Sequence, residues 1–158
     1  MLRRLAIALV LLPIAARAAE SCPWLNAATA GGVLGGTVSA QVTHPSANED
    51  DAACAFELRR GELSSRLTVN VTTMGAAKAE FPSLLAQCGA DKTELKAIGN
   101  EAFACGGADH GERWQRVVGR VRDRAFVIEL RSNDPTLAAD ALAGKAHQAA
   151  EQVAGILY

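Results

Sequence analysis

The sequence lacks the short motifs that identify most small enzymes and metal proteins. It contains no CxxC pair, no HExxH and no serine flanked by elbow glycines. The glycine-rich stretch over residues 31–36 has neither the lysine of a P-loop nor GxGxxG spacing, and the spacing of the cysteines matches no familiar zinc pattern. The sequence therefore indicates no catalytic residue, no metal site and no cofactor.

Long apolar runs are also scarce, and the one at the N-terminus has the form of an export signal. Residues 3–4 are both arginine, residues 5–14 are apolar, and Ala16 and Ala18 supply the small side chains that a signal peptidase needs at its two specificity positions. The apolar segment is far shorter than the ~20 residues that span a bilayer. We predict cleavage after Ala18, with a cut after Ala19 as the alternative, and we expect no transmembrane segment in the remaining chain.

Neither sign of charge is in large excess. The leader holds three of the 16 lysines and arginines and none of the 17 acidic residues, so the rest of the chain carries a formal charge of −4. Such a charge gives no general affinity for nucleic acid. We expect a signal peptide over residues 1–18 and a single bacterial domain over residues 19–158, periplasmic or secreted.

Four cysteines follow the leader: Cys22, Cys54, Cys88 and Cys105. In an exported chain of this size, four cysteines most often form two disulfides, for which three connectivities exist. Cys54 and Cys105 each share a strand face with a phenylalanine two positions away, which favours Cys22–Cys54 and Cys88–Cys105 as clamps between a helix and the sheet. The alternative is a redox pair or a metal site.

Apolar periodicity predicts three helices and seven strands. The expected helices cover residues 23–34, 75–89 and a long segment from residue 135. The expected strands cover residues 37–43, 54–59, 66–72, 94–98, 102–105, 114–121 and 125–131, with a glycine-rich loop over residues 106–111. The order α-β-β-β-α-β-β-β-β-α, with short turns between strands, favours an α+β fold in which helices pack on one face of an antiparallel sheet of about six to seven strands.

One strand face carries a tryptophan among arginines and is a candidate binding surface. We define this Trp114 face by five residues: Trp114, Arg116, Arg120, Arg122 and Arg131. Such a surface could bind an anionic small molecule, a glycan or an envelope protein. The alternative is a solvated sheet face whose arginines pair with Glu57 or Glu129.

Several short stretches match a known type of bacterial domain: residues 22–25, 54–56, 98–103, 124–128 and 146–157. In these stretches the chain resembles small exported domains of unknown function, namely actinobacterial secreted-lipoprotein domains and the extracellular sensor domain of mycobacterial serine/threonine kinases. The resemblance implies an antiparallel α/β sandwich with disulfides and no known catalysis, so no catalytic residue is carried over. The sequence departs from these families because it has no lipobox before Cys22 and no transmembrane or kinase segment.

These observations favour an exported, non-catalytic binding or sensing domain. The alternatives are an envelope structural or interaction protein, such as an accessory subunit or inhibitor, and a small hydrolase whose site is assembled in space. A deep pocket with clustered titratable groups would favour the hydrolase, and an apolar-lined pocket would favour small-ligand binding. A flat exposed surface around Trp114 would favour a protein partner.

Overall fold

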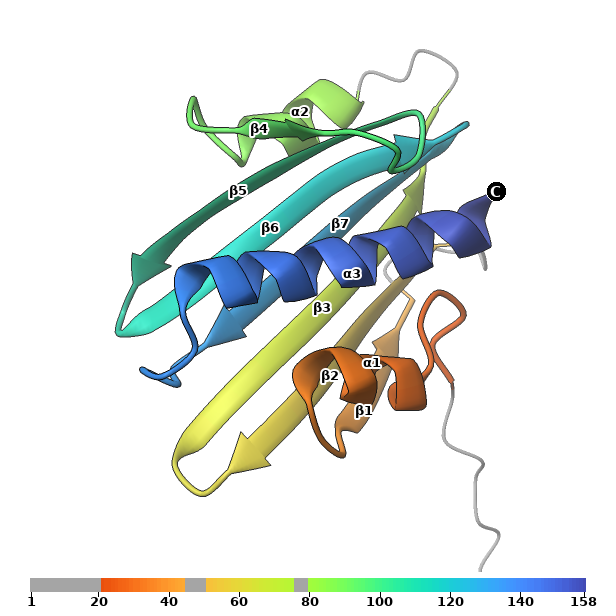
Figure 1. Cartoon of the computed structure of the whole chain (residues 1–158). Coiled ribbons are helices and arrows are strands. Elements are labelled where there is room, and N and C mark those ends of the chain that lie inside the picture. The colour runs from red at the N-terminus through yellow and green to blue at the C-terminus, as the bar shows by residue number, and fades with distance from the viewer. Residues whose placement is uncertain (1–20, 45–50, 76–79) are drawn as a thin grey trace, which may run out of the picture.

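The computed structural model describes residues 21–44, 51–75 and 80–158, which form three helices and seven strands (Figure 1). In chain order these are α1 (Ala27–Leu34), β1 (Ser39–Thr43), β2 (Ala52–Arg60), β3 (Leu63–Thr73), α2 (Glu80–Ala86), β4 (Thr93–Leu95), β5 (Glu101–Asp109), β6 (Glu112–Val121), β7 (Arg124–Ser132) and α3 (Ala139–Leu157). The predicted element order and the α+β class are confirmed. The predicted signal peptide and its cleavage sites lie outside the described residues.

All seven strands form one antiparallel sheet in the order β1-β2-β3-β7-β6-β5-β4. Tight turns with positive φ connect the hairpins: Gly61 lies between β2 and β3, His110 and Gly111 between β5 and β6, and Arg122 between β6 and β7. Positive φ at both His110 and Gly111 gives a turn whose twist matches that of the flanking strands. The pairing of β3 with β7 joins the first three strands to the last four.

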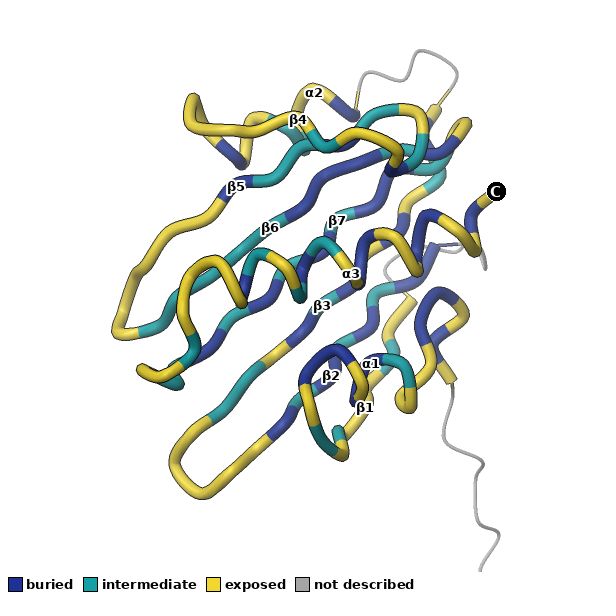
Figure 2. Tube along the Cα trace, in the orientation of Figure 1, coloured by how far each residue is buried: buried dark blue, intermediate teal, exposed yellow. Residues whose placement is uncertain are grey.

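The main hydrophobic core lies between one face of the sheet and the helices α1 and α3. The buried side of α3 is made largely of small residues: Leu142, Ala146, Ala149, Ala150, Val153, Ala154 and Leu157. This stripe lets the helix lie close against β6 and β7, as its alanine content predicts. Burial is concentrated in the middle of the sheet, while the end of the β2–β3 hairpin is exposed (Figure 2).

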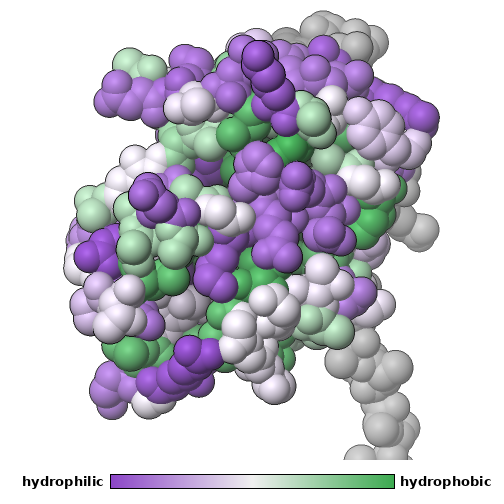
Figure 3. Space-filling view, viewed as in Figure 1, coloured by the Kyte–Doolittle hydropathy of each residue, from purple (hydrophilic) through white to green (hydrophobic). Residues whose placement is uncertain are grey.

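Hydrophilic and hydrophobic side chains are interspersed over the outer surface of this helical layer (Figure 3). Three large apolar side chains of the described residues are exposed: Leu63, Ile156 and Tyr158. Among the described helices, none combines the length and the apolar character needed to cross a bilayer.

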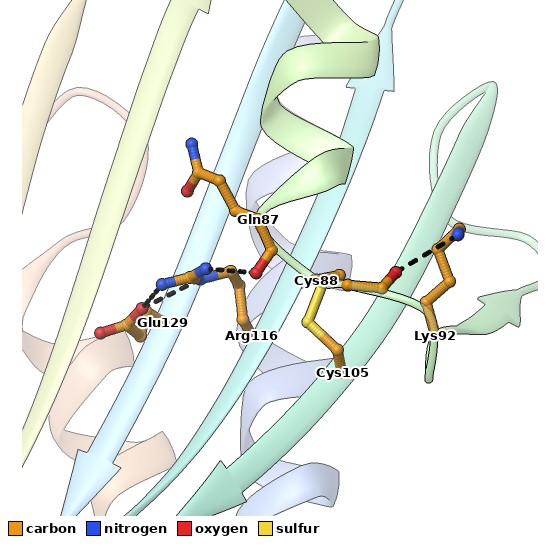
Figure 4. Close-up of a disulfide and its surroundings, with 7 residues drawn as sticks. Gln87, Cys88, Lys92, Cys105, Arg116 and Glu129 are labelled. Carbon is orange, nitrogen blue, oxygen red and sulfur yellow. Dashed lines mark hydrogen bonds and ion pairs between the residues drawn. A yellow bond between two sulfur atoms is a disulfide. The ribbon is translucent and has the colours of Figure 1, made fainter. Parts of the chain in front are cut away.

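The prediction that all helices pack on one face is wrong for α2. Adjacent residues Val117 and Val118 belong to different buried clusters, because their side chains point to opposite faces of β6. Val118 packs in a second, smaller cluster with Phe81 of α2 and with the disulfide between Cys88 and Cys105. Figure 4 views this second face, with α2 and α3 on opposite sides of the strands.

Both favoured disulfides are present. Cys22 pairs with Cys54 of β2, with a Cα–Cα distance of 5.8 Å, and Cys88 pairs with Cys105 of β5, with a Cα–Cα distance of 5.5 Å. Cys54 lies in the main core and Cys105 in the second cluster. Each face of the sheet therefore has one covalent clamp to the segment that packs on it.

Two helices begin later than predicted because local side chains make turns first. The Oδ1 of Asn26 accepts a hydrogen bond from the amide of Thr29 at 2.8 Å, so α1 begins at Ala27 rather than at residue 23. Asp134 similarly accepts hydrogen bonds from the amide and hydroxyl of Thr136, so α3 does not begin at residue 135.

Residues 106–109, predicted as a loop, form the end of β5. A Cβ atom at Gly106 would lie 2.1 Å from Nε2 of Gln115, and one at Gly107 would lie 3.0 Å from the ring of Trp114. The two glycines therefore make room for large side chains on the neighbouring strand β6. Their presence reflects this close packing and not a break in the strand.

Candidate functional site

The structure brings together three of the five residues of the Trp114 face. Trp114 lies opposite Arg131 in the β6–β7 register, and the guanidinium of Arg116 lies 5.5 Å from the centre of the Trp114 ring. Arg120 lies farther along the same side of β6, opposite Glu101 of β5. Arg122 is in the exposed turn between β6 and β7, where its backbone carbonyl accepts a hydrogen bond from Arg120 at 3.4 Å.

Three arginines of the Trp114 face are paired with carboxylates, namely Arg116 and Arg120 of β6 and Arg131 of β7. Arg116 donates to Glu129, with Nε at 2.9 Å, and also contacts the carbonyl of Gln87 at 3.2 Å, next to the disulfide at the end of α2 (Figure 4). Arg120 forms an ion pair with Glu101. These contacts tie β5, β6, β7 and α2 to one another.

Arg131 is surrounded by three carboxylates. Its Nε donates to Glu112 at 3.0 Å, and its other nitrogens donate to Glu129 and Asp109. The hydrogen bond with Glu112 is the main reason that the pKa of Arg131 is raised above its ordinary value. The alternative prediction, that arginines of this face pair with Glu129 or Glu57, holds for Glu129, which pairs with Arg116 and Arg131. Glu57 pairs instead with Arg59 at 2.7 Å.

A pocket at one end of the sheet combines apolar walls with charged groups, unlike the Trp114 face. Its volume is about 310 Å³, and it lies where the β2–β3 hairpin meets the end of α1 and the first turns of α3. Its apolar walls come from four leucines: Leu34, Leu58, Leu63 and Leu137. Its charged and hydroxyl groups come from Arg60, Ser64, Ser65, Asp134, Thr136 and Lys145. We call it the Arg60–Lys145 pocket.

The two cations of this pocket are held by the carbonyl end of α1. Arg60 donates from a terminal nitrogen to the carbonyl of Gly35 at 2.5 Å, and Lys145 donates to the carbonyl of Val33. The last carbonyls of a helix have no partner within the helix and carry a partial negative charge, so cations bind there favourably. Arg60 and Lys145, which are far apart in sequence, are thereby positioned at the same pocket.

The glycines that end α1 make this arrangement possible. Gly35 has φ of 90°, a left-handed conformation that favours glycine, and its amide bonds to the carbonyl of Gly31. A Cβ atom on Gly36 would lie 2.9 Å from Leu58, a pocket residue. The glycine-rich stretch is thus a helix end with close packing, and Gly35 forms part of the pocket wall.

The pocket carries a net positive charge. Within the described chain, neither Arg60 nor Lys145 has an ion-pair partner, and Asp134 is the one carboxylate that lines the pocket. Hydrogen bonds from Thr136 are the main cause that lowers the pKa of Asp134, with the positive charges of Arg60 and Arg113 as smaller causes. Asp134 is therefore ionised at neutral pH, and two positive charges face one negative charge.

The sequence predicted the Trp114 face and missed this pocket. The only local signal was the glycine pair after α1, which marks a helix end whose carbonyls attract cations. Nothing in the spacing of Arg60 and Lys145 indicates that β2 and α3 bring them to that end. In the described residues, no group of three His, Cys, Asp or Glu side chains is placed to hold a metal ion.

No family model, curated protein or solved structure matches the chain. The resemblance to secreted-lipoprotein domains and kinase sensor domains therefore stays a prediction.

Proposed function

We propose that this chain is an exported, non-catalytic domain that binds a small molecule in the Arg60–Lys145 pocket. The leader-like N-terminal sequence and the two disulfides support export. The pocket volume of about 310 Å³ is at the lower end of the range for ligand sites. The combination of leucine walls with a few convergent polar groups is typical of such sites.

One observation carries this proposal: both cations are fixed by backbone carbonyls and not by carboxylates. A side chain that is already held in place loses little conformational freedom when a ligand arrives, which favours binding. Because the carbonyls bear only partial charges, both side chains keep a full positive charge for a ligand. A sensing role would follow from the same binding event if a partner protein detected the occupied state.

Binding can be tested by two-dimensional NMR of the oxidised, ¹⁵N-labelled domain against a library of small fragments. We expect the hits to shift amides around the pocket, namely those of Gly35, Ser64, Ser65 and Leu137. A screen in which no fragment shifts these amides would overturn the proposal. Hits confined to Trp114 and its neighbours would also overturn it and would favour recognition by the Trp114 face.

Export has its own test, intact mass measurement of protein recovered from the periplasm or medium. We expect a mass that lacks residues 1–18 or 1–19 and is four hydrogens lighter than the fully reduced chain. A mass with the leader still attached, or with four free thiols, would contradict the exported state.

A second candidate function is an envelope interaction protein that uses the Trp114 face. The observation that favours it is a tryptophan beside arginines that are fixed by neighbouring carboxylates, residue types that are common at the centres of protein interfaces. Variants Trp114→Ala and Arg120→Glu test it. If both retain every measured binding activity, this surface has no role in recognition.

A further inference from the structure

We infer that the ligand of the Arg60–Lys145 pocket is a monoanionic carboxylic acid with an aliphatic chain. This inference rests on the proposed function, because it specifies the chemistry of a molecule that would occupy the same pocket. It depends on three properties of the pocket: its net charge, the hydrogen-bond donors that remain available, and its apolar walls.

The net charge favours an anion with a single charge. Arg60 and Lys145 contribute two positive charges, and Asp134 returns one negative charge. Counted over the residues that line the pocket, a ligand with one carboxylate gives a net charge of zero, whereas a neutral ligand leaves a net positive charge. Arg113, whose charge also acts on Asp134, is not among the lining residues. A dianion would instead leave an excess of negative charge close to Asp134.

The available donors are mainly those of the two cations. A guanidinium has five N–H donors and an ammonium has three, and the contacts with the carbonyls of Gly35 and Val33 involve one nitrogen of each side chain. The hydroxyl of Ser65 is engaged with Ser132 at 2.8 Å, and that of Thr136 donates to Asp134 at 2.7 Å. A carboxylate suits the planar guanidinium, while a sugar would need more free hydroxyl partners.

The apolar walls indicate an aliphatic chain next to the carboxylate. Of the leucines that line the pocket, Leu34 and Leu58 are buried and Leu63 is 37% exposed. Leu63 is one of three large apolar side chains that the described residues leave exposed. An aliphatic chain that covers it removes apolar surface from water, which is favourable in proportion to the area covered.

The test compares octanoate with octanamide, which has the same chain length and no charge. Both are titrated into the full oxidised domain, and the shifts of the amides of Gly35, Ser64 and Leu137 are followed by NMR. We expect octanoate to bind at least about tenfold more tightly than octanamide, since tenfold corresponds to a modest difference in binding free energy. Octyl phosphate, which carries more charge, is expected to bind more weakly than octanoate.

Two variants remove one charge each, Arg60→Gln and Lys145→Met. We expect each to weaken octanoate binding about tenfold or more and to leave octanamide binding nearly unchanged. The matched control is Arg59→Gln, because Arg59 is adjacent in sequence, is 74% exposed and pairs with Glu57 on the other face of the strand. If a charge-removing variant does not fold, Arg60→Lys and Lys145→Arg keep the charge and should retain the preference for octanoate.

The outcomes separate this inference from the proposed function. Equal affinity for octanoate and octanamide, or tighter binding of octyl phosphate, would overturn the carboxylate assignment while a ligand still occupied the pocket. If fragments from the NMR screen bind in the pocket and octanoate does not, the assignment fails and the proposed function stands. If neither octanoate nor any fragment shifts the pocket amides, both fail.

Discussion

The Trp114 face and the Arg60–Lys145 pocket both place arginine at a surface, but with different partners. On the Trp114 face, Arg116 and Arg131 are paired with carboxylates of the same sheet. In the pocket, Arg60 is paired with a backbone carbonyl. A carboxylate cancels the charge of a guanidinium, whereas a carbonyl fixes its position and leaves its charge. The number of arginines on a surface is therefore a poor guide to where an anion will bind.

Removal of either disulfide should reduce the free energy of unfolding more than any single substitution of a charged residue, and removal of the Cys88–Cys105 bond should affect the Trp114 face and not the pocket. In the chain-entropy model, Cys22→Ser with Cys54→Ser should destabilise the domain by about 3.5 kcal/mol and Cys88→Ser with Cys105→Ser by about 3 kcal/mol. Urea denaturation measures both values. Because the second disulfide anchors α2 beside Arg116, its loss should shift amides of the Trp114 face and leave octanoate binding unchanged.

Loss of either disulfide with a cost below about 1 kcal/mol would contradict a structural role. A change in octanoate affinity after removal of the Cys88–Cys105 bond would show that the two regions are coupled, contrary to the separation seen in the fold.

Glu129→Gln should have the next largest effect, because it leaves Arg116 without its carboxylate in a largely buried position. The two side chains are 20% and 18% exposed, and we expect a loss of about 2 kcal/mol in urea denaturation. Glu57→Gln is the control, since it breaks an exposed pair with Arg59 and should cost less than about 1 kcal/mol. Equal costs for the two variants would contradict the assignment of Glu129 as the counter-ion of a half-buried pair.

The same variant sharpens the comparison of the two regions. Without the charge of Glu129, the Trp114 face would gain net positive charge, and octanoate should begin to shift amides near Trp114. If octanoate still binds only in the pocket of this variant, the apolar pocket walls contribute more to octanoate binding than an arginine without a carboxylate partner does.

Lys145→Met should reduce stability by only about 0.5 kcal/mol, the usual size of a cation's interaction with a helix end. The measured quantity is the urea midpoint at low and high salt, with Arg59→Gln as the matched control for the loss of an exposed surface cation. A loss of several kcal/mol would mean that Lys145 holds α1 in place, and its effect on ligand binding would then be indirect.

The smallest effect concerns pH and Asp134. Hydrogen bonds from Thr136 hold the pKa of Asp134 below the ordinary value of 3.8, so the folded state favours the ionised carboxylate. The resulting stability is present above that ordinary value and is lost as pH falls through the lowered pKa of the folded state. Wild type should therefore melt slightly above Asp134→Asn at pH 6, and this difference should disappear at strongly acid pH. A constant difference would contradict the assignment.

Much of the fold could be predicted from the sequence because it depends on local patterns. Alternation at residues such as Leu67, Val69 and Val71 predicts a strand that has one buried face, and the structure buries all three. Strand parity also favoured the disulfide pairing, because it places Cys54 and Cys105 on buried faces. These signals need only the geometry of a single strand.

The side of the sheet that each helix covers could not be predicted in the same way. Parity shows that Phe103 and Cys105 share a face, but it does not show that this face is opposite to that of Cys54. The Arg60–Lys145 pocket was missed for a related reason, since it depends on how α3 crosses the sheet and reaches the end of α1. Interactions between distant elements decide both features.

The pairing of β3 with β7 sets the order in which the sheet can form. Thr68 and Glu129, which are bonded across this seam, are 61 residues apart, so a long loop must close before the seam is made. Neither disulfide crosses this seam. Cys22–Cys54 joins two residues that precede β3, and Cys88–Cys105 joins two residues that lie between β3 and β7 in the chain. Oxidation can therefore be complete in each half while the seam is still open, and we expect the joining of two cross-linked halves to limit the folding rate.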